Sequence, residues 1–204
     1  TIPAQYLLPE ILMKFNERYP KEQVKLLETD SSQVVTKIID HMVDVGFTGT
    51  VLEKKHCKYI PFYKEELIVI TPNTEKYQVL HQNIEDISWI SEECLIMREE
   101  GSGTRKEAGK QLRNAGINLD KLKIIASIEN QETIKKSVKQ GMGISIISRL
   151  AAEEEAKSGD LLTFPIPKAD QGRDINLVYN KNYQMSKSAE RFIKVVKEVY
   201  GIEE

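Results

Sequence analysis

The residues best able to do chemistry form a short turn, Gly-Ser-Gly-Thr, at positions 101–104. The apolar run Cys94–Met97 before it predicts a strand, and the apolar spacing after it predicts a helix over 105–115. At the start of a helix the first N–H groups lack partners within the helix and the helix dipole is positive. The turn could therefore bind a carboxylate or an oxyanion through backbone donors and hydroxyls. The simpler interpretation is that Ser102 and Thr104 only cap the helix.

Charged residues beside the turn bear on both interpretations. Thr104 and Glu107 have the spacing of a capping box, which predicts that Thr104 caps the helix. Arg98 and Arg105 flank the turn and could add positive charge to an anion site.

Further loops after predicted strands carry similar groups. Ligands of open α/β sheets bind at the carboxyl ends of strands, so we expect these loops to converge on one ligand. The expected ligand-binding residues are Thr1, Ile2, Pro3, Thr48, Gly49, Ser102, Gly103, Thr104, Glu129 and Asn130. Hydroxyls and backbone N–H groups dominate this set, which suits a small anion or carboxylate. The alternatives are an ordinary turn at Thr48–Thr50 and a helix cap at Asn130.

Catalytic and metal-binding patterns find little support. His41, His56 and His81 are scattered, and Cys57 and Cys94 are too few for a disulfide framework. The turn at 101–104 lacks the lysine of a phosphate-binding P-loop. We therefore expect no enzyme activity, no metal site and no cofactor.

Composition limits the classes of partner. The chain has 204 residues, 40% of them hydrophobic, and 29 basic residues balance 31 acidic ones. Such a charge balance gives no footprint for a phosphate backbone, and Lys135, Lys136 and Lys139 are interpreted as a solvated helix face. No run is long and apolar enough for a membrane span, and the first residues do not have the charged-then-apolar pattern of a signal peptide. We expect a cytoplasmic protein with no membrane contact.

Hydrophobic periodicity predicts alternating strands and helices. A helix over 5–18 precedes a strand at Val24–Glu28, and a second helix capped by Asp30 or Ser31 precedes a strand at Val45–Phe47. With a first strand at the very start of the chain, this order is βαβαβ, which is typical of a parallel sheet. Further strands are expected at 59–62, 67–71, 89–90, 94–97, 124–127, 144–147, 161–164 and 175–179, and further helices at 105–115, 131–140, 150–157 and 186–200.

Three stretches resemble, in their order and spacing, the effector-binding domain of LysR-type transcriptional regulators. They are Thr1–Pro9, then Arg98–Arg105, and last Glu129–Lys135 followed by Gly141–Ser145. The resemblance covers essentially the whole chain. It implies an α/β fold with two lobes like those of type 2 periplasmic-binding proteins, each a mostly parallel sheet flanked by helices. A small effector, an anion or a carboxylate, would be held between the lobes.

The resemblance also implies a domain plan. Lobe I would comprise residues 1–71 and 170–204, and lobe II would comprise residues 72–169. Such regulators carry an N-terminal winged helix-turn-helix domain, which this sequence lacks. We therefore expect a fragment of a larger regulator that contacts DNA only through that domain.

The family implies self-association as well. Its effector-binding domains form antiparallel homodimers through the first helix of one subunit and a lobe II helix of the other, here 7–18 and 132–140, with a tetramer at full length. Leu7 and Met13 fit such a contact, because they are apolar positions off the core stripe of the first helix. A wider buried face within one lobe is the alternative.

Two other classes of protein remain open. An extracytoplasmic solute-binding protein of a transporter would share the fold, and a signal peptide encoded upstream would distinguish it from a regulator. An enzyme on the same scaffold would need a nucleophile or a cofactor lysine that we do not identify. Relatives that sense sulfur oxyanions carry hydroxyl or amide side chains where this chain has Ile2 and Pro3. This difference and the acidic Glu129 argue against a sulfate-like effector and leave open an effector with amine and acid groups.

Overall fold

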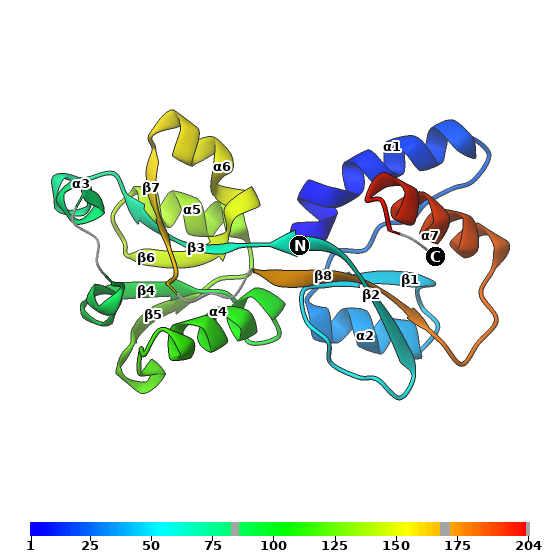
Figure 1. The fold of residues 1–204 in the computed structure, drawn as a ribbon, viewed down its shortest axis with the longest axis horizontal. Coiled ribbons are helices and arrows are strands. Elements are labelled where there is room, and N and C mark those ends of the chain that lie inside the picture. Colours follow the sequence, from blue (N-terminus) through cyan, green and yellow to red (C-terminus); the bar gives the residue numbers. More distant parts are fainter. Residues whose placement is uncertain (83–85, 168–171, 203–204) are drawn as a thin grey trace. The chain divides into compact units, whose positions relative to one another are not determined.

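The computed structural model describes residues 1–82, 86–167 and 172–202. The chain divides into two compact units, and Figure 1 shows the elements of each. Unit 1 comprises Thr1–Lys64 and Arg173–Glu204, and unit 2 comprises Glu65–Gly172. Unit 2 is thus inserted into the sequence of unit 1.

Unit 1 combines a small sheet with three α-helices. Its strands are β1 (Val45–Thr48), β8 (Arg173–Asn180) and β2 (Cys57–Glu65), in that order across the sheet, and β1 pairs antiparallel with β8. Its helices are α1 (Leu8–Arg18), preceded by a π-helical turn at Pro3–Leu7, α2 (Ser31–Ile39) and α7 (Lys187–Val199). The Asp30 and Ser186 side chains cap α2 and α7 by accepting hydrogen bonds from backbone N–H groups.

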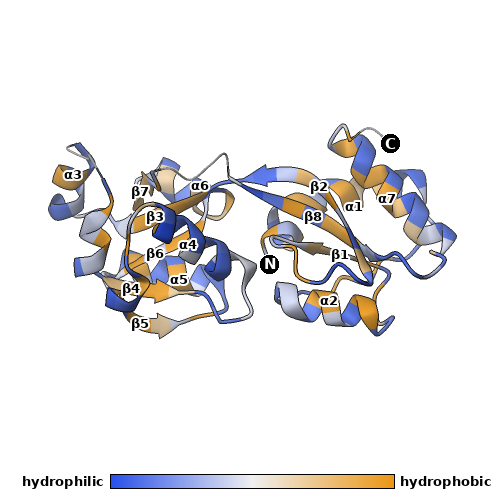
Figure 2. Cartoon of the chain, turned by 60° about the horizontal axis from the view of Figure 1, so that its bottom comes forward, coloured by the Kyte–Doolittle hydropathy of each residue, from blue (hydrophilic) through white to orange (hydrophobic). Residues whose placement is uncertain are grey.

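The core of unit 1 follows from the apolar stripes of its helices. Leu8, Ile11 and Phe15 of α1 are buried. The Phe15 ring packs edge-on against Phe192 of α7, with ring centroids 5.3 Å apart. Figure 2 shows the corresponding alternation of apolar and polar residues along α1 and α7. Burial of these stripes supplies most of the stability of such a unit.

Unit 2 contains a larger mixed sheet. Its strands are β3 (Leu67–Pro72), β4 (Cys94–Met97), β5 (Lys123–Ser127), β6 (Ile144–Ser148) and β7 (Leu161–Pro165). Their order is β5-β4-β6-β3-β7; β4 runs parallel to β5 and β6, and β3 runs antiparallel to β6 and β7. The helices are α3 (Glu75–Gln82), α4 (Gly103–Asn114), α5 (Gln131–Lys139) and α6 (Arg149–Ser158), with 3-10 turns at Ser88–Glu92 and Leu119–Lys121. One face of the sheet packs Leu95 and Ile144 against Ala108 and Leu112 of α4.

The predicted α/β class is confirmed, but the prediction of mostly parallel sheets is wrong. Antiparallel pairs occur in both units. In unit 1, β8 pairs antiparallel with β1, and in unit 2, β3 pairs antiparallel with β6 and β7. Residues 23–30 form no strand in the described part of the chain, although Val24 and Leu26 alternate. These side chains are about half exposed, so they lack the buried face that stabilises a strand.

Three other expectations also need correction. The predicted strand at Trp89–Ile90 is part of a 3-10 turn, and α3 lies in a stretch for which no helix or strand was predicted. The lysines of α5 are not all solvated, because the Lys135 side chain is buried and forms ion pairs with Glu132 and Glu155.

The boundaries of the units differ from the expected ones. Residues 65–71, expected in lobe I, belong to unit 2, because β3 forms its ladders with β6 and β7. The expected second boundary, between residues 169 and 170, lies outside the described residues.

Candidate functional site

Three parallel strands of unit 2 end at the same edge of its sheet. β4 lies between β5 and β6. Helix α4 leads from β4 to β5, and α5 leads from β5 back past β4 to β6. Because such crossovers are right-handed, the two helices cover opposite faces of the sheet. Ligands of open α/β sheets bind where the chain changes face in this way, so the loops after β4 and β5 form the candidate site.

The turn after β4 has the geometry of a capped helix start. Ser102 Oγ accepts a hydrogen bond from the Arg105 N–H at 3.3 Å, and the Ser102 N–H donates to the Glu99 carbonyl at 3.1 Å. Ser102 is therefore the N-cap, and the predicted cap at Thr104 is wrong because Thr104 already lies inside α4. Glu107, the other half of the expected capping box, accepts instead from Gln111. The N–H groups of the first turn of α4 still point out of the N-terminal end of the helix.

The two arginines beside this turn bind protein groups. Arg98 is buried and makes a bidentate ion pair with Glu99, with both N···O distances 2.8 Å. Arg105 Nη1 donates to the Arg98 carbonyl at 2.9 Å and to Ser127 Oγ at 3.3 Å. The loop after β4 is thereby tied to the end of β5. The arginines thus stabilise the turn. The candidate hydrogen-bond donors to a ligand are Ser102, Gly103 and Thr104.

The loop after β5 leads into α5. Asn130 is the N-cap, and its Oδ1 accepts hydrogen bonds from the N–H and hydroxyl of Thr133 at 3.0 and 3.3 Å. Glu129 is exposed. The next residue, Gln131, is 2% exposed. Sequence reasoning missed Gln131, although its position three and seven residues before Ile134 and Val138 places a polar side chain on the apolar stripe of α5.

The expected site residues of unit 1 form a second group. Ile2 and Pro3 are buried in the opening turn, which packs against β1. Thr48 is 1% exposed, and its hydroxyl donates to the Thr50 carbonyl at 2.9 Å. A Cβ at Gly49 would lie 2.7 Å from Cζ of Arg173, so the guanidinium lies against the Gly49 backbone.

Arg173 is a second residue that sequence reasoning missed. It is 7% exposed and begins β8. Its signal in the sequence is a lone arginine just before the apolar run of that strand. The structure thus places Thr1, Ile2, Pro3, Thr48 and Gly49 in unit 1, and Ser102, Gly103, Thr104, Glu129 and Asn130 in unit 2.

Unit 1 also contains a cavity of about 330 Å³. Thr1 and Pro3 line it, together with Phe15, Phe47 and residues 23–29. The cavity thus separates β1 from the segment that was expected to pair as a strand. Leu12 of α1, Val34 of α2 and Phe192 of α7 form part of its apolar wall, and Gln23, Lys25 and Asp44 are among its polar lining residues.

Reactive side chains in other parts of the described chain do not form a second candidate site. The described residues include no group of three or more His, Cys, Asp or Glu side chains placed to hold a metal ion. Cys57 is buried, and burial raises the pKa of its thiol, which disfavours the nucleophilic thiolate. His56 lies 3.4 Å from the Glu53 carboxylate. None of the described helices has the length and apolar character of a membrane span.

Known proteins resemble this chain over nearly its full length. The family model described as LysR substrate binding domain matches residues 1–201. The transcriptional regulator YeiE of Escherichia coli K12 is 26% identical over 193 residues, which cover 93% of this chain and 63% of that protein. The regulator CysL of Bacillus subtilis is 22% identical over 197 residues, which cover 97% and 64%. The chain therefore spans a little under two thirds of the length of these curated relatives.

Solved structures have the same fold. The effector binding domain of QuiR in complex with shikimate matches with a TM-score of 0.84 and 16% identity, covering 98% of this chain and 92% of that one. The regulatory domain of CcmR from Synechocystis PCC6803, in complex with 2-PG, matches with a TM-score of 0.84 and 24% identity, covering 97% and 92%. The effector binding domain of BenM with its effector benzoate matches with a TM-score of 0.76 and 17% identity, covering 97% and 89%.

Proposed function

The chain belongs to the family of LysR substrate binding domains, and on that premise we propose that it senses a small carboxylate and controls DNA binding by a full-length transcriptional regulator. The relatives YeiE and CysL are transcriptional regulators, which favours a regulator over a transporter's solute-binding protein. The observation that carries the ligand class is the turn of Ser102, Gly103 and Thr104 at the carboxyl end of β4. Helix-start donors and hydroxyls suit a carboxylate group.

The ligands of related structures support this class of effector. QuiR was solved with shikimate and BenM with benzoate, and both compounds are small carboxylates. Arg98 and Arg105 are engaged with protein groups, so we propose that neutral donors supply most contacts to the carboxylate. An effector held this way shifts the regulator between states by its differential affinity for them.

Replacing Ser102 and Thr104 together with alanine is expected to weaken binding of the effector by about 1 to 3 kcal/mol, because two hydroxyls are lost from the site. A thermal-shift screen of small carboxylates identifies the effector, and titration calorimetry measures its affinity for the variant.

Loss of the Ser102 cap also destabilises α4, so the control is Ser186→Ala. Ser186 caps α7 with the same geometry, accepting from the Ala189 N–H at 3.2 Å. Both changes should lower stability by about 1 kcal/mol, but only the double variant should lose affinity. Equal affinities for all three proteins would remove this turn from the binding site.

We also propose the properties that belong to the whole protein. The DNA contact lies in an N-terminal winged helix-turn-helix domain encoded upstream of Thr1. The role is sensing rather than catalysis, and the location is the cytoplasm. The sequence upstream of Thr1 tests these proposals together, since a signal peptide there would support a solute-binding protein instead.

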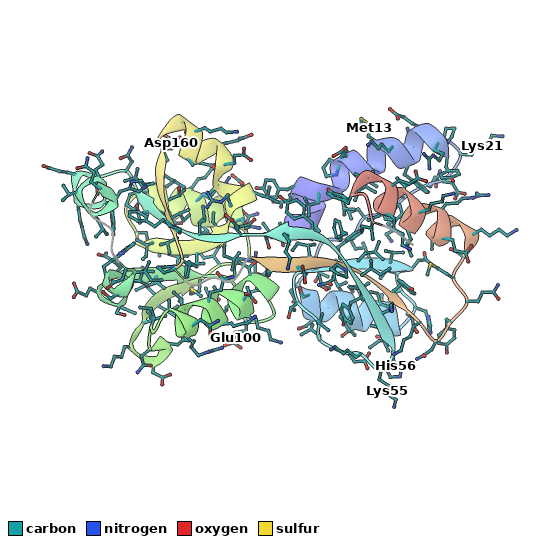
Figure 3. All side chains as sticks on the ribbon, viewed as in Figure 1. Met13, Lys21, Lys55, His56, Glu100 and Asp160 are labelled. Carbon is teal, nitrogen blue, oxygen red and sulfur yellow. The ribbon has the colours of Figure 1, made fainter. Side chains whose placement is uncertain are left out.

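We propose a homodimer in which α1 of one copy contacts unit 2 of the other, where the expected contact was the helix 132–140, and exposed apolar residues on each unit support it. In unit 1, Met13 of α1 is 55% exposed, and Figure 3 shows it on the side of α1 that faces away from α7. In unit 2, Ile124 and Ile125 of the edge strand β5 are 44% and 39% exposed. If two copies pair in antiparallel orientation about a two-fold axis, both of these surfaces are buried on each copy. Leu7 does not contribute, because it is buried within unit 1.

A Met13→Asp variant is expected to sediment as a monomer at micromolar concentration while the unaltered chain sediments as a dimer. A carboxylate buried without a partner should weaken such an interface at least tenfold. The control is Met42→Asp, at a residue of unit 1 that is 63% exposed and lies outside α1. A monomeric unaltered chain, or a Met13→Asp variant that stays dimeric, would rule out this interface.

A further inference from the structure

Gln131 stands out among the buried polar residues of unit 2. Its side chain is 2% exposed, and neither Nε2 nor Oε1 has a hydrogen-bond partner in residues 1–82, 86–167 and 172–202. Asn130, next to it, uses its side chain to cap α5. An amide with both atoms buried and unpartnered lowers stability, since it gives up its hydrogen bonds to water without replacement.

The position of Gln131 links it to the candidate site. It is the first residue of α5, at the carboxyl end of β5, and β5 is the direct neighbour of β4 in the sheet. The loop after β4 carries Ser102 and is tied to the end of β5 by the bonds from Arg105. The amide therefore lies at the same sheet edge as the turn proposed to bind a carboxylate.

A second unpartnered group lies at this edge. Ser148 ends β6, which also runs parallel to β4, and its buried hydroxyl has no partner within the described chain. Although Ser148 is the N-cap of α6, its side chain makes no capping hydrogen bond. Unpartnered polar groups at the ends of two strands indicate a polar binding region rather than an isolated defect.

We propose that Gln131 determines effector specificity by binding a hydroxyl group that the effector carries beside its carboxylate. This inference rests on the proposed function. A carboxylate offers only acceptors, so it could satisfy Nε2 but not Oε1. A hydroxyl accepts from Nε2 and donates to an acceptor, and two neighbouring hydroxyls satisfy both amide atoms. The effector is therefore a hydroxylated small carboxylate.

Removal of the amide has opposite expected effects on stability and on binding. In Gln131→Met an unbranched apolar side chain of similar size replaces the amide, so the ligand-free chain should melt at the same temperature or higher. The matched control is Gln111→Met. Gln111 is also buried, but its Nε2 donates to Glu107 at 3.0 Å, so its loss should lower the melting temperature.

Binding is measured by calorimetry with two pairs of probes, shikimate against benzoate and glycerate against propionate. The first compound of each pair carries hydroxyls and the second does not. The unaltered chain should prefer the hydroxylated member of at least one pair. Gln131→Met should weaken binding of that member about tenfold or more, a loss typical of one unmade hydrogen bond in a buried site. Affinity for the other member should change less than about twofold.

Each outcome decides between the two proposals. If the unaltered chain binds neither these four probes nor any compound of the small-carboxylate screen, the proposed effector class is wrong, and the role of Gln131 is wrong with it. If a probe binds and Gln131→Met leaves its affinity unchanged, or if no hydroxylated member is preferred, only the role of Gln131 is overturned. A lower melting temperature of ligand-free Gln131→Met would also overturn it, because the amide would then serve the fold.

Discussion

Replacing Lys135 with alanine is expected to lower the free energy of unfolding by about 3 to 5 kcal/mol, as is typical when one partner of a buried ion pair is removed. The Lys135 side chain is 7% exposed, and its Nζ lies 2.8 Å from Glu132 and 2.7 Å from Glu155. Glu155 belongs to α6 and is itself 21% exposed. Without the lysine, the Glu155 carboxylate is still largely removed from water, but it no longer has the positive charge of Lys135 to compensate. Urea unfolding followed by circular dichroism measures the change.

Two further variants separate the ion pair from other effects. Lys136→Ala removes the same side chain from an exposed position of α5 and should change stability by less than about 0.5 kcal/mol. The double variant Lys135→Met with Glu155→Leu removes both charges, so it should recover most of the lost stability. A loss in the double variant as large as in Lys135→Ala would show that packing, not charge, dominates.

A Gly143→Ala variant is expected to destabilise the protein by about 3 kcal/mol, because an added methyl group would overpack the centre of the sheet of unit 2. A Cβ at Gly143 would lie 2.4 Å from the Cys94 carbonyl oxygen. Both residues stand at the start of the β4 and β6 pairing, where Leu95 is opposite Ile144. The clash is with backbone, so only a shift of one strand could relieve it.

The matched control for that variant has the opposite expected sign. Gly109 lies inside α4, and a Cβ there would meet only Leu119 Cδ1, at 3.5 Å, and Arg113 Nη1, at 3.9 Å. Alanine at this helical position should stabilise the protein by about 1 kcal/mol. Thermal unfolding of both variants measures the pair. Destabilisation by both to the same extent would mean that the close approach at Gly143 is not what matters.

Local signals in the sequence were sufficient where they agreed with packing. The turn at 101–104 and its flanking strand and helix follow from apolar spacing and turn chemistry, and β4 begins and ends at the predicted residues. The cap itself shifted from Thr104 to Ser102, because two residues of the turn can each supply a hydroxyl acceptor. Which of them caps depends on the backbone path, which composition does not specify.

Other features depend on partners distant in sequence. Val24 and Leu26 alternate as a strand would, but a strand also needs a ladder, and a cavity lies between this segment and β1. Lys135 looked like a solvated residue because its partner Glu155 is on another helix. Sheet direction was misjudged for the same reason, since alternation along a strand does not tell which neighbour it pairs with.

The residues missed at the candidate site share a property. Arg173 and Gln131 are polar residues of types that usually lie on the surface, and both are buried at the first residue of an element. A pattern search for hydroxyl-rich turns does not find them. Their burial is a property of the folded chain, because it arises from residues that the sheet brings together.

The close approach of the two ends of unit 2 makes that unit a self-contained module. A Cβ at Gly172 would lie 2.3 Å from the Glu65 carbonyl oxygen, so the first and last residues of the insertion touch. The chain passes between the units next to these two residues, and on the unit 1 side Lys64 Nζ lies 2.8 Å from Asp174 Oδ1. An insertion whose ends already meet can be excised, and a short linker can close the gap that it leaves. Residues 65–172, produced alone, would carry both Ser102 and Gln131, so the contribution of this half to effector recognition becomes separable from that of the rest.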